Sequence, residues 1–75
     1  MTTRIEYNGH VIEAKTRHKA SPTGWTLEVR ITNLGSPPAV RRCRAPNTYE
    51  SKQIAVHHCL EFGRRIVDGK LHPIS

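Results

Sequence analysis

Apolar and polar residues alternate along much of the first two thirds of the chain. The clearest stretch is residues 25–32, where an apolar side chain stands at every second position. A period of two places alternate side chains on opposite faces of a β-strand. The apolar set is Trp25, Leu27, Val29 and Ile31. This segment is therefore predicted to be a strand with one apolar face and one polar face.

Turn residues on either side of this segment separate it from three further predicted strands. The first strand spans residues 4–7 and is followed by Asn8-Gly9, a strong hairpin signal because both positions of the turn need a positive φ. The second strand spans residues 10–18. Pro37-Pro38 ends the third strand, since proline cannot donate to a sheet ladder. Residues 40–45 form a short fourth strand, which Pro46-Asn47 is expected to stop.

The pattern changes to a helical period in the last third of the chain. Ser51 is a candidate N-cap, and Asp68-Gly69 supplies a C-terminal stop for a helix that ends near Val67. At 100° per residue the helix has one apolar face and one polar face. The apolar face comprises Ala55, Cys59, Phe62 and Ile66, with Val56 and Gly63 at its margins.

Docking this apolar face on the strand that starts at Trp25 gives a two-layer α+β domain. The predicted fold is a four-stranded antiparallel meander covered on one face by a C-terminal helix, ββββα. We expect Phe62 to pack against Trp25, and Gly63 to mark a close approach of the helix to the sheet. With 75 residues, the chain is predicted to be a single domain over residues 1–70 with a short tail over 71–75.

Residues 55–70, together with Tyr7-Asn8-Gly9 and the strand that begins at Gly24-Trp25, resemble short bacterial proteins with no established activity. The resemblance covers most of the chain. It implies the same layout of four strands followed by a helix, and it assigns no site.

Candidate chemistry is sparse in this sequence. His57-His58-Cys59 looks like a metal site, but neighbouring helical residues point 100° apart, whereas helical ligand pairs need a spacing of three or four. Cys43 and Cys59 are expected to be buried, reduced thiols. The chain has no phosphate loop, nucleophile elbow or paired-carboxylate motif. We therefore expect a non-enzymatic protein with no catalytic residue, metal or cofactor.

The expected cellular location of the protein is inferred from the targeting and membrane-spanning segments that the sequence lacks. No secretory signal is expected, because the first residues of the sequence contain no apolar run, and no stretch of about 20 apolar residues could span a membrane. Two cysteines do not form a disulfide framework. A cytoplasmic location without a membrane partner is expected.

Positive charge is the strongest functional signal, because the formal net charge is +6. Alternation puts six basic residues on the sheet face away from the helix, against Glu6, Glu13 and Glu28, for a net charge of +3 on that face. Arginine suits phosphate because its planar fork can donate two hydrogen bonds at once. The predicted nucleic-acid-binding residues are Arg4, Lys15, Arg17, Arg30, Arg42 and Arg44, with Arg64 and Arg65 as a second edge on the helix.

The basic surface also has a purely structural interpretation. Basic residues on open strands prevent edge-to-edge aggregation. Exposed aromatic residues for base stacking are few, with Tyr7 pointing inward and Tyr49 in a loop as the one free platform. The order of strands and helix is similar to that of double-stranded-RNA-binding domains, but this chain lacks their first helix.

The alternative function is a protein-binding or homodimerisation module that uses an exposed sheet edge. Val11 and Val40 are expected to point outward and to form an apolar spot on the charged face.

Overall fold

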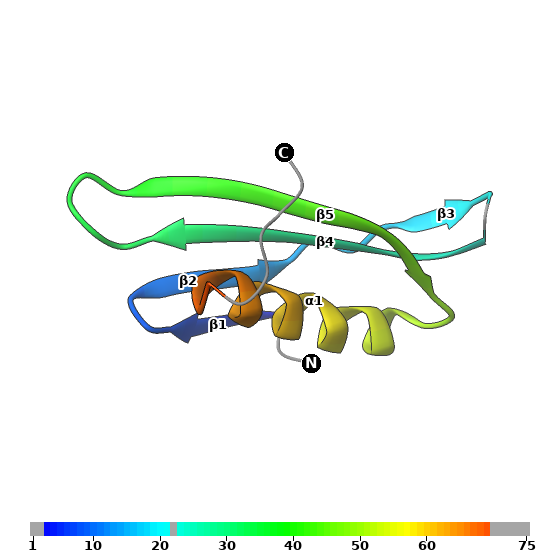
Figure 1. The fold of residues 1–75 in the computed structure, drawn as a ribbon. Helices are drawn as coiled ribbons and strands as arrows, with labels where there is room; N and C mark the ends of the chain where they lie inside the picture. Colours follow the sequence, from blue (N-terminus) through cyan, green and yellow to red (C-terminus); the bar gives the residue numbers. More distant parts are fainter. Residues whose placement is uncertain (1–2, 22, 70–75) are drawn as a thin grey trace.

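A computed structural model describes residues 3–21 and 23–69 of the chain. The tail predicted over 71–75 lies outside the described residues. Five strands precede one helix, and all pairings between strands are antiparallel (Figure 1). The elements are β1 (Arg4–Tyr7), β2 (His10–Ala14), β3 (His18–Ala20), β4 (Thr23–Asn33), β5 (Ala39–Tyr49) and α1 (Lys52–Val67).

The sheet is built around β4. One edge of β4 pairs with β2 and, further along, with β3, while its other edge pairs with β5. β1 pairs with the outer edge of β2. The predicted α+β class, with an antiparallel sheet and a C-terminal helix, is confirmed. The strand count is five instead of four.

The strand predicted over 10–18 ends at Ala14, and the extra strand, β3, covers His18–Ala20, almost entirely beyond the predicted range. The backbone stays close to β4 through the break, since Lys15 N donates to Glu28 O at 2.9 Å and Thr26 N donates to Arg17 O at 2.8 Å. Between these two bonds the Thr16 hydroxyl donates to the Thr26 carbonyl at 2.6 Å. A side chain thus takes up a carbonyl at the point where the regular ladder is interrupted.

The expected stop at Pro46 is wrong, because β5 continues through it to Tyr49. Leu27 lies opposite Ala45, whereas the preceding residue of β4, Thr26, lies opposite Thr48. Pro46 and Asn47 therefore have no direct partner on β4. An edge strand with an irregularity is where a sheet tolerates a residue that cannot donate a hydrogen bond.

The helix begins and ends as predicted. The Ser51 side chain accepts a hydrogen bond from Ile54 N at 3.2 Å, which satisfies one of the free amides of the first turn. At the other end, Asp68 N donates to Arg64 O at 2.9 Å. Gly69 follows with a φ of 74°, a conformation that glycine adopts at little cost.

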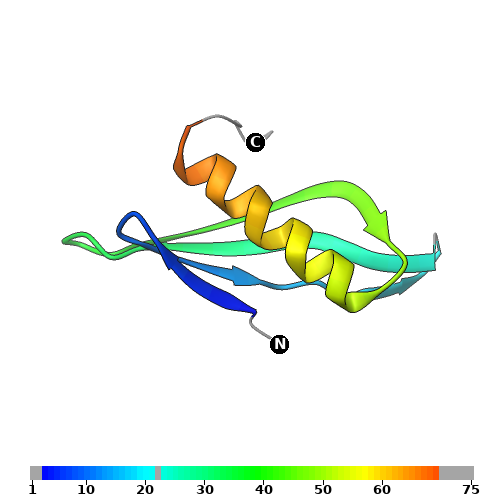
Figure 2. The same ribbon diagram turned by 90° about the horizontal axis from the view of Figure 1, so that it is seen from below.

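The helix lies diagonally across one face of the sheet (Figure 2). The core forms between these two layers, and Ile12, Val29 and Cys59 are its largest fully buried side chains. Gly63 approaches the sheet so closely that a Cβ atom there would collide with Cγ2 of Ile12 and lie 3.3 Å from Cγ2 of Val29. The predicted close approach at Gly63 is confirmed.

The expected contact between Phe62 and Trp25 is replaced by two separate environments. Phe62 is half-buried against the core cluster that contains Ile12. Trp25 is half-buried beside His18, with ring centroids 5.3 Å apart, and the Lys52 ammonium lies 6.0 Å from its ring. Because Lys52 is the first residue of α1, Phe62 lies ten residues, or about 15 Å, further along the helix axis.

The apolar spot expected from Val11 and Val40 is not formed. Val11 is 4% exposed, although alternation places it on the face away from the helix, whereas Val40 is 62% exposed. The cause is strand position. Val11 lies between Glu6 and Thr32 on flanking strands, while Val40 lies on the edge strand β5.

The turn between β1 and β2 is tied to the end of the helix. Tyr7, which packs against the core with Ile5 as predicted, donates its hydroxyl hydrogen bond to the Asp68 carboxylate at 2.8 Å. This hydrogen bond raises the pKa of Tyr7, since the nearby carboxylate disfavours the phenolate. Asn8 Nδ2 donates to the same carboxylate at 3.5 Å.

Candidate functional site

The strand register gathers basic residues into rows across the face of the sheet that the helix leaves open, which we call the open face. In one row Arg4 on β1 lies opposite Glu13 on β2, Glu13 lies opposite Arg30 on β4, and Arg30 lies opposite Arg42 on β5. One residue from each of four neighbouring strands therefore contributes a charge. Three of these four charges are positive.

A second row lies beside the first. Lys15 is bonded through its backbone to Glu28, and Glu28 lies opposite Arg44. Arg17 enters this row from the break between β2 and β3, with its Nε 3.0 Å from Oε2 of Glu28. The two rows together bring onto one surface the six basic residues that the sequence assigned to the sheet.

Ion pairs neutralise the middle of this surface. Arg30 Nη2 lies 2.7 Å from Oε1 of Glu13, and its Nε donates to the same oxygen at 3.1 Å. The hydrogen bond from Arg30 is the main reason that the pKa of Glu13 lies below its ordinary value. Lys15 lies further from Glu13, at 3.7 Å.

Glu28 is held as a carboxylate in the same way. Partial burial favours its neutral form, but hydrogen bonds from the Thr26 hydroxyl and from Arg17 outweigh burial and lower the pKa of Glu28. Arg17 and Arg30 therefore each already donate two hydrogen bonds to a carboxylate of the protein itself.

The arginines on β5 are different. Arg42 and Arg44 are exposed, and neither forms an ion pair with any of the described residues. Arg42 lies opposite Arg30 in the β4–β5 ladder, but the Arg30 guanidinium is bonded to Glu13 on the other side of β4. Arg42 and Arg44 are therefore arginines of this surface whose charge is not balanced by an ion pair with a neighbouring carboxylate among the described residues.

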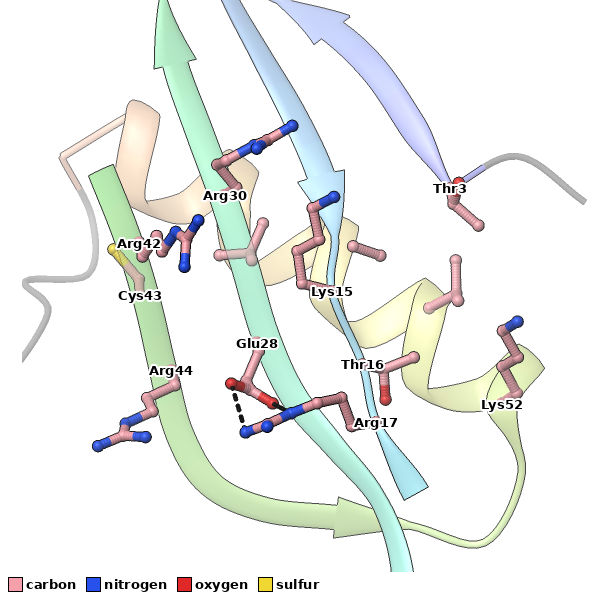
Figure 3. A pocket seen from close by; sticks show the side chains of 13 residues that line it. Thr3, Lys15, Thr16, Arg17, Glu28, Arg30, Arg42, Cys43, Arg44 and Lys52 are labelled. Atoms are coloured by element: carbon pink, nitrogen blue, oxygen red, sulfur yellow. Dashed lines mark hydrogen bonds and ion pairs between the residues drawn. The ribbon is translucent and has the colours of Figure 1, made fainter. Parts of the chain in front are cut away.

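An open depression of about 850 Å³ has lining residues on both sides of the sheet (Figure 3). From the open face it is lined by Lys15, Arg17, Glu28, Arg30, Arg42 and Arg44, and from the helix side by Val29, Cys43 and Val56.

Lys52 at the start of α1 also lines the depression, and the sequence reasoning missed it. The signal available was its position, because a cation in the first helical turn opposes the helix dipole.

Arg64 and Arg65 are not brought to the open face. They lie in the last turn of α1, on the layer that covers the other side of the sheet. Arg64 Nη1 is 2.9 Å from Oε1 of Glu61, and its guanidinium lies 5.7 Å from the Tyr7 ring centroid. The predicted set of eight basic residues therefore divides into six on one layer and two on the other.

Tyr49 is not the free loop platform that the sequence suggested. It is the last residue of β5, it is half-buried, and its ring stacks on His58 with centroids 4.3 Å apart and an interplanar angle of 4°. The reason is the continuation of β5 past Pro46, which carries Tyr49 onto the sheet beside the helix.

Cys43 on β5 and Cys59 on α1 are buried as predicted, and the neighbouring histidines of the helix point to solvent. Cys43 and Cys59 are free and buried, and burial raises the pKa of both thiols. His57 and His58 are exposed. Within residues 3–21 and 23–69, no three side chains of histidine, cysteine, aspartate or glutamate are grouped so that they could hold a metal ion.

Among the elements that the structure describes, α1 is the one helix, and it is neither long nor apolar enough to cross a membrane. No protein-family model matches the chain, and no curated protein or solved structure matches it.

Proposed function

We propose that the protein is a small, non-enzymatic accessory module that binds the phosphate backbone of nucleic acids through its open face. The observation that carries the proposal is the pair of exposed arginines on β5, Arg42 and Arg44, which lack an ionic partner among the described residues while a third arginine lies opposite one of them. Guanidinium groups donate two hydrogen bonds to one phosphate, so each can engage the ligand without losing a partner in the protein.

The remaining charges of the open face support this assignment. Arg30 and Arg17 are paired with Glu13 and Glu28, so Arg42 and Arg44 are the neighbouring cations that can meet a ligand without giving up an ion pair with a described residue. The binding expected from this arrangement depends on charge and not on base sequence, because phosphate contacts position a ligand without reading it.

A homodimer formed through the outer edge of β5 is the second candidate, and the charges disfavour it. Antiparallel pairing of two β5 strands would bring together residues of the segment that contains Arg41, Arg42 and Arg44. Arginines along an edge strand oppose such pairing. The apolar spot that favoured this alternative is also missing, since Val11 is buried.

The resemblance to short bacterial proteins supports a bacterial source, and we include this source and a cytoplasmic location in the proposal. A cytoplasmic protein meets RNA and DNA directly. Two free, buried cysteines are in keeping with a reducing compartment.

The test is a salt titration of binding to labelled nucleic acid, with two variants that remove the same charge from opposite layers. We expect binding of the wild type to weaken steeply as salt rises from about 50 to 200 mM. Arg42→Gln with Arg44→Gln should weaken binding and reduce the salt slope by about 2, one for each lost phosphate contact. The matched control, Arg64→Gln with Arg65→Gln, should leave both quantities nearly unchanged.

Two results would contradict the proposal. One is an absence of binding to any RNA or DNA at about 50 mM salt, where electrostatic binding is strong. The other is an equal loss of affinity in both double variants, which would show that only net charge matters. Circular dichroism of each variant establishes that it is folded.

A further inference from the structure

The free cations of the open face form two separate lines. Arg42 and Arg44 make one line on the edge strand β5. Arg4 on β1 and Lys15, which directly follows β2, make the other, which runs obliquely across the opposite side of the sheet. Arg4 is exposed and forms no ion pair with a described residue, and Lys15 has only the 3.7 Å contact with Glu13.

A nearly neutral strip separates the two lines. It contains the Arg30–Glu13 and Arg17–Glu28 ion pairs, which lie on β2, β4 and the segment between β2 and β3. Arg4 and Arg42 are three strand spacings apart in the same row, a backbone separation of roughly 14 Å at about 4.8 Å per spacing. Lys15 and Arg44 are two spacings apart, or about 10 Å, because Lys15 is bonded to Glu28 and Glu28 lies opposite Arg44. The carboxylates in the strip would repel a phosphate placed at its centre.

From this arrangement we infer that the ligand of the open face is a nucleic-acid duplex, an inference that rests on the proposed function. A single strand presents one line of phosphates, whereas a duplex presents two lines that flank a groove. The major groove of B-form DNA is about 12 Å wide, close to the separation of the two cation lines. The neutral strip then faces the groove, where no phosphate lies.

The placement of the aromatic residues points to the same ligand. Proteins that bind single strands stack exposed aromatic rings on unpaired bases. In this structure the rings are engaged elsewhere: Tyr7 with Asp68, Tyr49 with His58, and Phe62 with the core. Trp25 is half-buried beside Lys52 of the helix. The open face, as far as it is described, offers no stacking platform, and a duplex needs none because its bases stack on each other.

The experiment compares a labelled duplex with each of its single strands, in DNA and in RNA, at one low salt concentration and then over a salt series. We expect the duplex to bind at least about tenfold more tightly than either strand. With four phosphate contacts, duplex affinity should fall about a hundredfold between 50 and 200 mM salt. Arg4→Gln with Lys15→Gln should reduce the salt slope on the duplex by about 2, as much as Arg42→Gln with Arg44→Gln does.

The outcomes separate this inference from the proposed function. Equal or tighter binding of single strands overturns the duplex assignment and leaves phosphate binding intact. The assignment also fails if the Arg4 and Lys15 variant binds the duplex like the wild type, since Arg4 and Lys15 would then make no contact with its phosphates. An absence of binding to every probe rejects the proposed function itself. The Arg64 and Arg65 double variant again serves as the charge-matched control.

Discussion

At the scale of single residues, Gly63 sets the distance between the helix and the sheet, because it has no side chain to hold them apart. Gly63 sits in the middle of the buried helix face, and its neighbour across the interface, Ile12, is fully buried. Glycine normally weakens a helix interior by about 1 kcal/mol relative to alanine. Here the lower helix propensity is offset by packing, because the missing side chain lets the helix and the sheet come into contact.

We therefore expect Gly63→Ala to destabilise the protein, although alanine is the better helix former. Overpacking a well-filled core costs about 1 to 3 kcal/mol, which exceeds the gain in helix propensity. The measurement is the free energy of unfolding in urea. Adding Ile12→Ala as a second change removes the colliding methyl group, so the same glycine substitution should then cost less. A Gly63→Ala protein as stable as the wild type would contradict the close approach.

At the scale of elements, the helix is defined by its ends. The Ser51 side chain satisfies a backbone amide of the first turn, and no acidic residue in that turn supplements it. The N-terminal end of α1 therefore depends heavily on one hydroxyl.

Ser51→Ala should lower the free energy of unfolding by about 1 kcal/mol, the usual cost of losing an N-cap. Ser21→Ala is the matched control, because Ser21 is exposed and makes no side-chain hydrogen bond with a described residue. Urea midpoints of the two variants give the comparison. If both lose the same stability, the cap does not support the helix.

The elements also show which features a sequence can predict. The helix bounds follow from local signals at Ser51 and Gly69, and the face of the sheet on which the basic residues lie follows from alternation. Non-local features were missed. Pro46 is tolerated because of the register between β4 and β5, and Val11 is buried because strands flank it on both sides.

The candidate site was predictable to the same extent. Alternation identified its six residues on the sheet, but separating free from paired arginines requires knowing which carboxylate lies opposite each of them. Arg64 and Arg65 were predicted as a second basic edge on the helix, and the structure places them in the last turn of α1, on the other side of the sheet from the open face.

At the scale of the whole molecule, two glutamates of the open face, Glu13 and Glu28, make the free energy of unfolding depend on pH. The pKa values of Glu13 and Glu28 are lowered in the folded protein by hydrogen bonds from arginine and, for Glu28, threonine side chains. A group with a lowered pKa in the folded state contributes stability above its unfolded pKa. That contribution is lost as the pH falls through the folded value.

Stability should therefore decline as the pH drops below the ordinary glutamate pKa of 4.5. Replacing both residues, Glu13→Gln with Glu28→Gln, should lower stability near neutral pH and make the acid decline shallower. Urea midpoints over a pH series measure both effects. Glu50→Gln is the control, because Glu50 is exposed and forms no ion pair with a described residue. An unchanged acid profile in the double variant would show that these carboxylates do not couple folding to protons.

Alkylation of the two buried cysteines can be used to measure how often the folded chain opens. Both lie in the apolar interior on different elements, Cys43 on β5 and Cys59 on α1, and each thiol resists ionisation there. An alkylating reagent in solution can therefore modify Cys59, which is 0% exposed, only when the helix lifts from the sheet or the chain unfolds, whereas Cys43 also lines the open depression. Because nucleic acid would bind the face opposite the helix, slower alkylation in its presence would measure how far a ligand on one layer holds the other in place.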